Sequence, residues 1–344
     1  LVIWEKSLGP EQPDVGEALN DLAILHMAKN DINQAIAFMS RANAVSERNL
    51  ALNLAIGSER QKLTHLAALS KQTDQTITLH LRYAPHDPVA RRLALALILQ
   101  RKGRALDATS ESLNSLRGRL NAEDQALLDR LTQTRSQLAR LILRGLQKMT
   151  AEQYRGQIKE LEDQAERYET DISLRSSEFR TQALHVTLEA VQAAIPADAA
   201  LIEFAIYHPF KAKATKVEAY GQPRYVAYIL RHNGEIQWKE LGEAKPIDDA
   251  IAALRKALRN PNRRDVKRLA RAVDERVFHS LRPLLGEQTR LLFSPDGQLN
   301  LIPFAALVDE QGRYLVERYS ISYLASGRDL LRLQVARESK DGPM

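Results

Sequence analysis

Two kinds of hydrophobic pattern divide the chain. From Val15 to about Ile195, apolar residues recur every three or four positions, the spacing that places them on one face of an α-helix. From Ala199 onward, short apolar runs of strand length alternate with turn residues and with two further helical stretches. The sequence therefore predicts an all-helical region followed by an α/β domain.

The first helical stretches form a pair. One runs from Val15 to about Lys29, and the next begins at Ile32, with small residues at Ala23, Ala35 and Ala42 that would let antiparallel helices approach closely. The first eight residues also align with residues 43–50, a spacing of 42 residues that is within the range of helical repeats. This pair resembles a tetratricopeptide repeat of the longer, kinesin-light-chain-like kind. Since fewer than about three repeats seldom form a stable stack, we expect earlier repeats before Leu1.

Two apolar seams with four-three spacing predict long helices that pack against each other. The seams consist of Leu127, Leu131, Leu138 and Ile142, and of Tyr154, Ile158, Leu161, Ala165, Tyr168 and Ile172, with Phe179 one step later. We expect the loop between them at Gly145 to Thr150.

The pattern changes to strands after Pro196-Ala-Asp198. The segment His232-Asn-Gly-Glu235 lies between two β-prone runs, and Asn-Gly in such a place is a strong signal for a β-hairpin. We expect a mobile surface loop at Lys211 to Pro223. The remaining predicted elements are strands at Ala199–Tyr207, Arg224–Leu230 and Ile236–Leu241, and helices at Ile247–Arg259 and Asp265–Leu285.

The stretch from Thr289 to Leu333 predicts three short strands and a helix. The strands are Leu291–Phe293, Leu299–Pro303 and Tyr319–Leu324, and Pro295-Asp-Gly297 forms the first turn between them. Ser326, with Asp329 three residues later, is typical of a helix N-cap. We expect these strands to be inner strands of a parallel-type sheet shielded by helices.

These same residues resemble a known family. The run Ser294-Pro-Asp-Gly-Gln-Leu-Asn-Leu-Ile-Pro-Phe-Ala-Ala-Leu307, followed by Tyr314-Leu315 and Tyr319 to Ser326, is similar to the signature of the CHAT domain. That domain is a caspase- and separase-like cysteine protease module, commonly found downstream of tetratricopeptide repeats. The resemblance extends more weakly back to about Ala199. It implies the front half of such a domain, with the family's catalytic His and Cys on later strands beyond Met344.

The expected fold class is therefore α followed by α/β. A partial repeat (residues 1–46) and a region of long helical hairpins (47–198) precede the N-terminal portion of a caspase-like domain (199–344).

Candidate chemistry within the chain is sparse. There is no Cys, so the chain has no disulfide, no thiolate metal site and no cysteine nucleophile. None of the eight His has the His-Gly context that the family's catalytic His occupies, and His208, His232 and His279 are interpreted, like the others, as surface or packing residues. No Gly-x-Ser-x-Gly or His-Glu-x-x-His motif is present. We assign no catalytic, cofactor-binding or metal-binding residue, and expect no cofactor.

Two segments allow a functional and a structural interpretation. Asp296 and Asn300 follow a buried strand, where substrate-binding rims form, but turn chemistry alone explains an Asp before Gly297. The segment Leu99 to Asp107 contains a basic run that could suggest a phosphate-binding loop. It lacks the glycine pair and the Lys-Ser/Thr of a nucleotide cradle, so we favour a helical turn with exposed cations.

The charge pattern limits the expected partners. The net charge is +6, and the segment from Arg255 to Arg276 is conspicuously basic. Within it Val266, Leu269, Val273 and Val277 follow helical spacing, so the arginines would occupy the solvated face. Because no aromatic platform accompanies them, we do not expect nucleic acid as a partner. No apolar run reaches ~18 residues and no signal peptide is visible, so we expect a soluble, cytoplasmic protein without a membrane partner.

The leading hypothesis is a fragment of a bacterial repeat-containing CHAT protein. The complete protein would be a caspase-like cysteine endopeptidase acting on a protein substrate and regulated by a protein partner at its helical repeats. This chain alone would be inactive. The alternative is a non-enzymatic interaction scaffold with a degenerate caspase-like domain.

Overall fold

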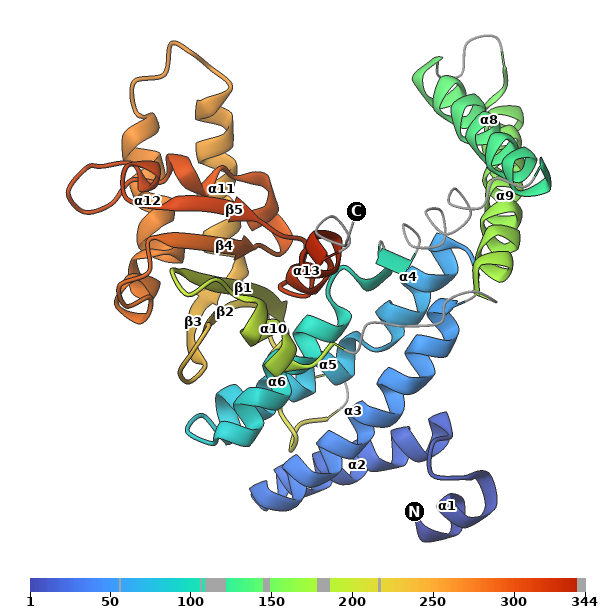
Figure 1. Cartoon of the computed structure of the whole chain (residues 1–344), viewed down its shortest axis with the longest axis horizontal. Helices are drawn as coiled ribbons and strands as arrows, with labels where there is room; N and C mark the ends of the chain where they lie inside the picture. Colours follow the sequence, from blue (N-terminus) through green and yellow to red (C-terminus); the bar gives the residue numbers. More distant parts are fainter. Residues whose placement is uncertain are drawn as a thin grey trace. The chain divides into compact units, whose positions relative to one another are not determined.

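The computed structural model describes residues 1–55, 57–105, 107–108, 122–144, 149–177, 186–215 and 218–338. The chain forms two compact units, each assembled from three separate segments (Figure 1). Unit 1 contains Leu1–Gly16, Ala44–Ser70 and Gly103–Ala183, and unit 2 contains Glu17–Asn43, Lys71–Lys102 and Leu184–Met344. Unit 1 includes residues on either side of the expected boundary at 46, and unit 2 includes residues on either side of both 46 and 198. The expected boundaries stay predictions.

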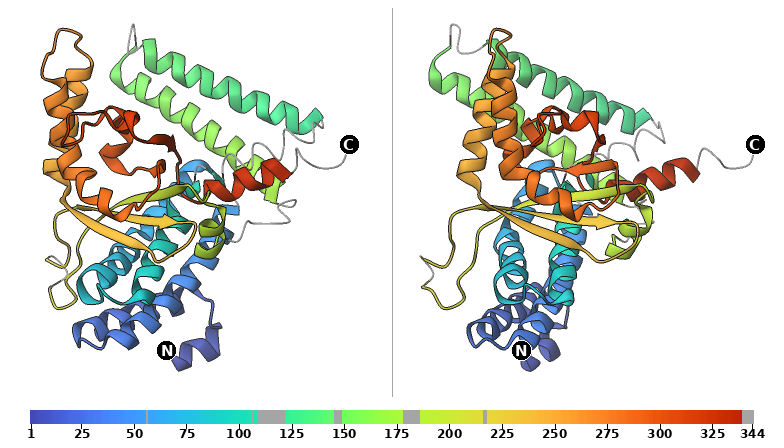
Figure 2. Two further views of the ribbon diagram at one scale, coloured as in Figure 1. Left: turned by 60° about the vertical axis from the view of Figure 1, so that its left-hand side comes forward. Right: turned by 90° about the vertical axis from the view of Figure 1, so that its left-hand side faces the viewer.

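Unit 1 is helical. Helices α8 (Ala122–Arg144) and α9 (Ala151–Ser177) lie side by side (Figure 2), and their contact buries Leu127, Leu131 and Ile172 from the predicted seams. Ile142, in the same seam, is 53% exposed, so the seam is not buried along its whole length. Residues 145–148 of the predicted loop, and Phe179, lie outside the described residues. Among its described residues, the unit also contains α1 (Val2–Leu8), α4 (Glu59–Ala68) and parts of α2 and α3.

Helices α2 (Pro13–Ala28) and α3 (Ile32–Ala55) form the predicted pair. Ala23, Ala35 and Ala42 are fully buried, as expected of small residues at a close helix contact. The part of this pair in unit 2 shares a core with the π-helix η1 (Leu79–Tyr83) and α6 (Pro88–Arg101), where α5 (Ser70–Thr78) leads into η1. Asp87 caps α6 by accepting hydrogen bonds from the N–H groups of Val89 and Ala90.

The sheet of unit 2 has five strands in the order β3-β2-β1-β4-β5. The predicted hairpin is present, since β1 and β2 are antiparallel and β2 and β3 are antiparallel, whereas β1, β4 and β5 are parallel neighbours. The strands are β1 (Ala199–Tyr207), β2 (Arg224–Arg231), β3 (Gln237–Glu243), β4 (Arg290–Ser294) and β5 (Ser320–Tyr323).

Helices cover both faces of this sheet (Figures 1 and 2). Ala200, Ile202 and Phe204 of β1 face α11 (Ala244–Leu258) and α12 (Val266–Val277). Their neighbours in the strand face α6, α10 (Leu188–Ala194) and α13 (Asp329–Glu338). A strand buried on both sides needs a continuous apolar run, which explains the sequence Ala-Ala-Leu-Ile at its start. The predicted α/β domain is confirmed.

The segment after β4 differs from the prediction. Leu299–Pro303 is not a strand, because the chain forms the 3-10 helices η3 (Gly297–Leu301) and η4 (Phe304–Ala306). Gly297 has a φ of +52°, which turns the backbone away from the sheet after β4. The apolar residues then pack onto the core, where the Phe304 and Phe293 rings stack with centroids 4.3 Å apart. A further 3-10 helix, η5 (Leu315–Glu317), precedes β5.

The ends of two other elements also differ from the prediction. Helix α13 begins at Asp329 rather than after Ser326, and the Asp329 carboxylate accepts hydrogen bonds from the N–H groups of Ala325 and Ser326. The expected mobile loop at Lys211–Pro223, of which residues 216–217 lie outside the described residues, is attached to helices on both sides of that gap. Phe210, just before the loop, and Ala219, within it, are buried in the core that contains α2 and α3.

Polar contacts reinforce this attachment. The Phe210 N–H donates to Thr78 Oγ1 at 3.0 Å, and Gln75 donates to the Tyr220 hydroxyl at 2.9 Å. Apolar and aromatic residues near the loop ends explain the difference, because they gain more by packing than by exposure. Among the described helices, none is long and apolar enough to cross a membrane.

Candidate functional site

The carboxyl ends of β1 and β4 mark the place where the sheet topology reverses. After β1 the chain continues to β2 on one side, and after β4 it continues to β5 on the other. In open α/β sheets, ligands commonly bind in the crevice at such a switch point. Glu203 of β1 lies opposite Ser294, the last residue of β4. These two residues therefore define the first candidate site.

A lysine from the end of α6 occupies this point. Lys102 Nζ lies 2.7 Å from Glu203 Oε1 and 2.8 Å from Ser294 Oγ. It also donates to the carbonyl oxygens of Phe204 at 2.9 Å and Ser294 at 2.7 Å. Both Glu203 and Ser294 are fully buried. The ammonium group thus fills the space at which a ligand would otherwise bind.

This arrangement contains a serine beside a lysine, but it is not a catalytic pair. A Ser–Lys hydrolase needs a lysine that accepts the serine proton and a serine that substrate can reach. Here the Ser294 hydroxyl donates to Glu203 at 2.6 Å, and all four atoms around Lys102 Nζ act as acceptors. The cluster holds structure together and does not activate a nucleophile.

The same contacts correct the interpretation of the basic run at Leu99 to Asp107. Its cations were expected to be exposed, yet Arg101 is only 7% exposed and Lys102 points into the sheet. Arg101 donates to Thr73 Oγ1 at 2.8 Å and to Gln72 Oε1 at 2.9 Å. Sequence spacing did not reveal this, because the carboxylate partner of Lys102 lies 101 residues away.

The start of α13 completes the cluster. Arg328 donates to the backbone carbonyls of Gln100 and Lys102, at 3.0 and 2.9 Å, and so satisfies the end of α6. The Gly327 N–H donates to Glu203 Oε2 at 2.8 Å. A Cβ at Gly327 would lie 2.4 Å from the Leu201 side chain, so this position requires glycine. Three elements distant in sequence are joined here.

Asp296 and Asn300 lie beside this cluster and have structural partners. Asp296 accepts hydrogen bonds from the N–H groups of Ile206 at 2.9 Å and Gly297 at 2.8 Å. Asn300 donates to the Gly297 carbonyl at 3.2 Å. One oxygen of the Asp296 carboxylate is used within the turn and the other by β1, in agreement with the structural interpretation rather than with a substrate rim.

His279 belongs to the one group of potential metal ligands found among the described residues. Its ring lies with Asp274 and Glu310, and the ligand atoms of all three are within 4.8 Å of one another. Arg282 pairs with both carboxylates, and Arg271 Nη1 lies 2.6 Å from Asp274. Burial raises the pKa of Asp274, although Arg282 counteracts the shift. Because two guanidinium groups already neutralise the carboxylates, the group is an ion-pair network rather than a metal site.

Sequence reasoning did not single out His80, which is fully buried. Its Nδ1 lies 2.8 Å from the Tyr228 hydroxyl, and its ring meets the Trp238 ring edge-on at 4.8 Å between centroids. Burial lowers the pKa of His80 to about 4. This histidine packs η1 onto the sheet.

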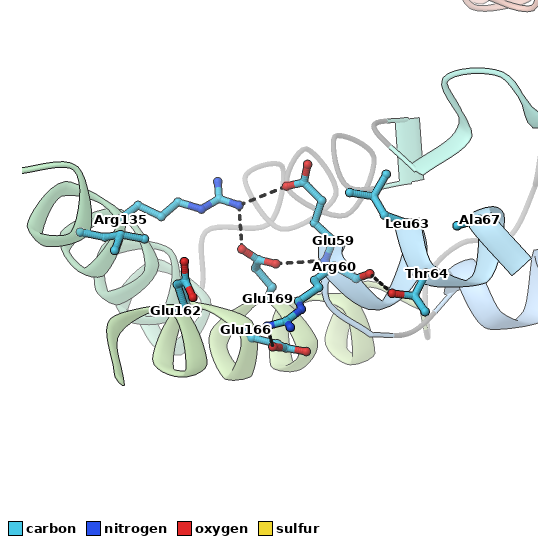
Figure 3. A pocket seen from close by; sticks show the side chains of 11 residues that line it. Glu59, Arg60, Leu63, Thr64, Ala67, Arg135, Glu162, Glu166 and Glu169 are labelled. Atoms are coloured by element: carbon cyan, nitrogen blue, oxygen red, sulfur yellow. Dashed lines mark hydrogen bonds and ion pairs between the residues drawn. The ribbon is translucent and has the colours of Figure 1, made fainter. Parts of the chain in front are cut away.

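Unit 1 contains a groove between α4, α8 and α9 (Figure 3). Its volume is about 900 Å³. Figure 3 shows Arg135 pointing between Glu59 and Glu169, with which it forms ion pairs of 3.6 and 2.8 Å. Among the described residues that line the groove, no nucleophile and base are paired. The residues that line it are Glu59, Arg60, Leu63, Thr64, Ala67, Arg135, Leu138, Glu162, Ala165, Glu166 and Glu169.

Taken together, the parallel β1-β4-β5 core and its helical layers define an α/β domain joined to a helical region. Residues 267–344 match the family model of the CHAT domain, as the sequence motif in Ser294 to Ser326 indicated. The match includes β4, β5 and α13, so this segment is similar to part of a CHAT domain. A search of curated proteins gives no match.

Proposed function

We propose that this chain contributes the first strands of a CHAT-type cysteine endopeptidase domain, together with a helical region that binds a regulatory protein partner. The observation that carries the proposal is the CHAT match at residues 267–344, which falls on two adjacent parallel strands, β4 and β5. In caspase-type hydrolysis, a thiolate attacks the scissile carbonyl and a histidine manages the proton. The resemblance to the family implies that both groups lie on later strands.

The chain itself supplies the scaffold rather than the reacting groups. It contains no Cys, and the candidate cluster at the carboxyl ends of β1 and β4 is sealed by Lys102. The catalytic pair would therefore come from residues outside 1–344. We propose a protein substrate for the complete enzyme, by analogy with the family.

Contacts within unit 2 support a link between helices and sheet. The loop after β1 packs on α2 and α3 through Phe210, and Lys102 at the end of α6 binds Glu203 in β1. If a partner moved these helices, these contacts would transmit the movement to the carboxyl end of β1. Tetratricopeptide repeats bind proteins on a concave surface, and the resemblance of α2 and α3 to such a repeat motivates this part of the proposal.

The test uses the natural polypeptide that contains this chain, with any sequence that follows Met344. We expect peptide cleavage that thiol reagents block and that replacement of a single Cys by Ala abolishes. Each Cys is replaced in turn, and folding is checked by circular dichroism. Undiminished cleavage in every Cys variant would refute the protease assignment.

The second candidate function is a non-enzymatic scaffold. It is favoured by the complete absence of Cys in these 344 residues and by the tight structural use of Ser294 and Glu203. A natural polypeptide that binds its partner through the helical region, but contains no His-Gly strand followed by a Cys strand, would support the scaffold.

A further inference from the structure

The groove of unit 1 has an apolar floor. Leu63, Ala67, Leu138 and Ala165 line it from three different helices, and Leu63 is 53% exposed. The two alanines are small, and they line the groove of about 900 Å³ together with the two leucines. An exposed leucine in a groove with small residues favours the entry of another apolar side chain.

The rim of this groove is acidic, in a chain whose net charge is +6. Among the described residues, four glutamates and two arginines line it, and an adjoining hollow on α9 adds Asp163, Asp171 and Arg167. Carboxylates thus outnumber guanidinium groups by six to three. The acidity is a local property of this surface rather than a reflection of composition.

Part of the rim is already used to hold the groove together. The Glu59 N–H donates to Glu169 at 3.0 Å, and the Ser58 hydroxyl donates to Glu166 at 3.2 Å. These bonds fix α4 onto α9 and so preorganise the walls. By contrast, within the described ranges neither Glu162 nor Asp163 has a cation within 4 Å. Both carboxylates are available to a partner.

We propose that this groove binds a cationic amphipathic helix of a protein partner, with an apolar row on the Leu63–Leu138 floor and Lys or Arg beside Glu162 and Asp163. The acidic rim favours a positively charged partner, and the apolar floor favours an amphipathic segment. A metal ion is a poorer occupant, because no three of the groove carboxylates converge among the described residues. The inference rests on the proposed role of the helical region and specifies the chemistry of its partner.

The experiment measures fluorescence anisotropy of a labelled model helix that has leucines on one face and lysines on the other. Glu162→Lys is compared with Glu160→Lys, which makes the same charge change at an exposed residue of α9 outside the groove. We expect Glu162→Lys and Leu63→Ser each to weaken binding about tenfold, and Glu160→Lys to change it by less than about twofold. Binding should also weaken as salt rises.

Several outcomes would overturn the proposal. If Glu162→Lys and Glu160→Lys lost equal peptide affinity, the attraction would be general rather than specific to the groove. If a peptide with glutamate in place of each lysine bound equally well, charge recognition would be excluded. Concentration-dependent dimers that the peptide disperses would identify a second copy as the occupant. Both mutated side chains in the groove are exposed, so circular dichroism should show retained helix content. None of these measurements uses peptidase activity. A failure of the groove proposal can therefore be told apart from a failure of the protease assignment.

Discussion

Lys102 and Glu203, 101 residues apart in the sequence, form an ion pair of 2.7 Å at the switch point of the sheet. The lysine ends α6, in the region expected to be a separate helical bundle, and the glutamate lies in the central strand β1. The pair therefore shows that α6 is part of the α/β layer of unit 2. It also places a charged group where the fold would otherwise leave a crevice.

The first prediction concerns this pair. We expect Lys102→Met to lower the free energy of unfolding of unit 2 by about 3 kcal/mol, because it leaves the buried Glu203 carboxylate without its cation. Ser294 and Gly327 still donate to Glu203, so unit 2 should remain folded. The measurement is urea denaturation at neutral pH, followed by tryptophan fluorescence of Trp238 in the sheet.

Two variants control for other effects of Lys102→Met. Adding Glu203→Gln should restore roughly half or more of the lost stability, since the buried charge is then removed as well. Lys245→Met breaks an exposed pair with Asp249 of 2.9 Å and should cost less than about 0.5 kcal/mol. Equal losses from the buried and the exposed substitution would contradict the burial argument.

Features that depend on residues close in sequence were predicted, whereas features that depend on residues distant in sequence were not. The hairpin around Asn233-Gly234 and the strand at Ala199–Tyr207 depend on neighbouring residues, and both were confirmed. The Lys102 cluster depends on residues from α6, β1 and β4 meeting in space. No local pattern specifies that meeting, so the basic run was wrongly predicted to be exposed.

The second prediction uses two glycines with positive φ. A Cβ at Gly297 would lie 2.2 Å from Ile206 Cδ1 and 2.8 Å from the Tyr225 hydroxyl, whereas one at Gly312 would meet nothing within 4 Å. We expect Gly297→Ala to cost about 2–4 kcal/mol, from backbone strain and overpacking together. Gly312→Ala should cost only about 1 kcal/mol, from the backbone alone. Thermal unfolding compares the two, and similar losses would show that packing around Gly297 relaxes freely.

The same turn explains the strand that was predicted but not found. Leu299–Pro303 is apolar and short, which fits a strand, but the same length also fits a 3-10 turn that buries Leu299 and Phe304. Periodicity cannot separate these alternatives over five residues. Gly297 decides between them, since its φ of +52° redirects the chain before a strand can begin.

The third prediction is a pH dependence caused by His80. Its pKa in the folded protein is about 4, below the ordinary value of 6.5, because burial disfavours the charged ring and Arg91 adds to the effect, while Asp87 opposes it. The unfolded chain therefore binds more protons between these pH values. Stability from this residue is fully present above about pH 6.5 and is lost as pH falls toward 4, by at most about 3 kcal/mol.

The measurement compares urea unfolding of the natural chain and of His80→Phe from pH 7 to pH 4. The variant loses the hydrogen bond to Tyr228 but keeps a ring against Trp238. Since carboxylates also titrate in this range, the informative quantity is the difference between the two proteins, which should shrink as pH falls. His65→Phe, at an exposed histidine, should leave the pH dependence unchanged. A constant difference between the natural chain and His80→Phe would contradict the assignment.

The fourth prediction concerns the basic hairpin formed by α11 and α12. Residues 255–276 contain nine Lys and Arg and three Asp and Glu, a net charge of +6 that equals the net charge of the whole chain. Ala270, Val273 and Val277 are buried, so the cations lie on the solvated side, as expected. Asp265 neutralises part of the tip by pairing with Arg263 and Arg268, and Arg263 lowers the pKa of Asp265 to about 2.

We expect this hairpin to cause weak, salt-dependent and sequence-independent attraction to polyanions, rather than specific nucleic-acid recognition. Arg264→Glu, at an exposed cation of the tip, should therefore lower the salt concentration at which the chain elutes from heparin. Lys245→Glu makes the same charge change near the start of α11, outside residues 255–276, and should have a smaller effect. Arg264→Glu should also weaken duplex DNA binding more than Lys245→Glu does, and the natural chain should show no preference among DNA sequences. If one DNA sequence bound much more tightly at physiological salt, and Arg264→Glu abolished that preference, the hairpin would be a specific nucleic-acid site.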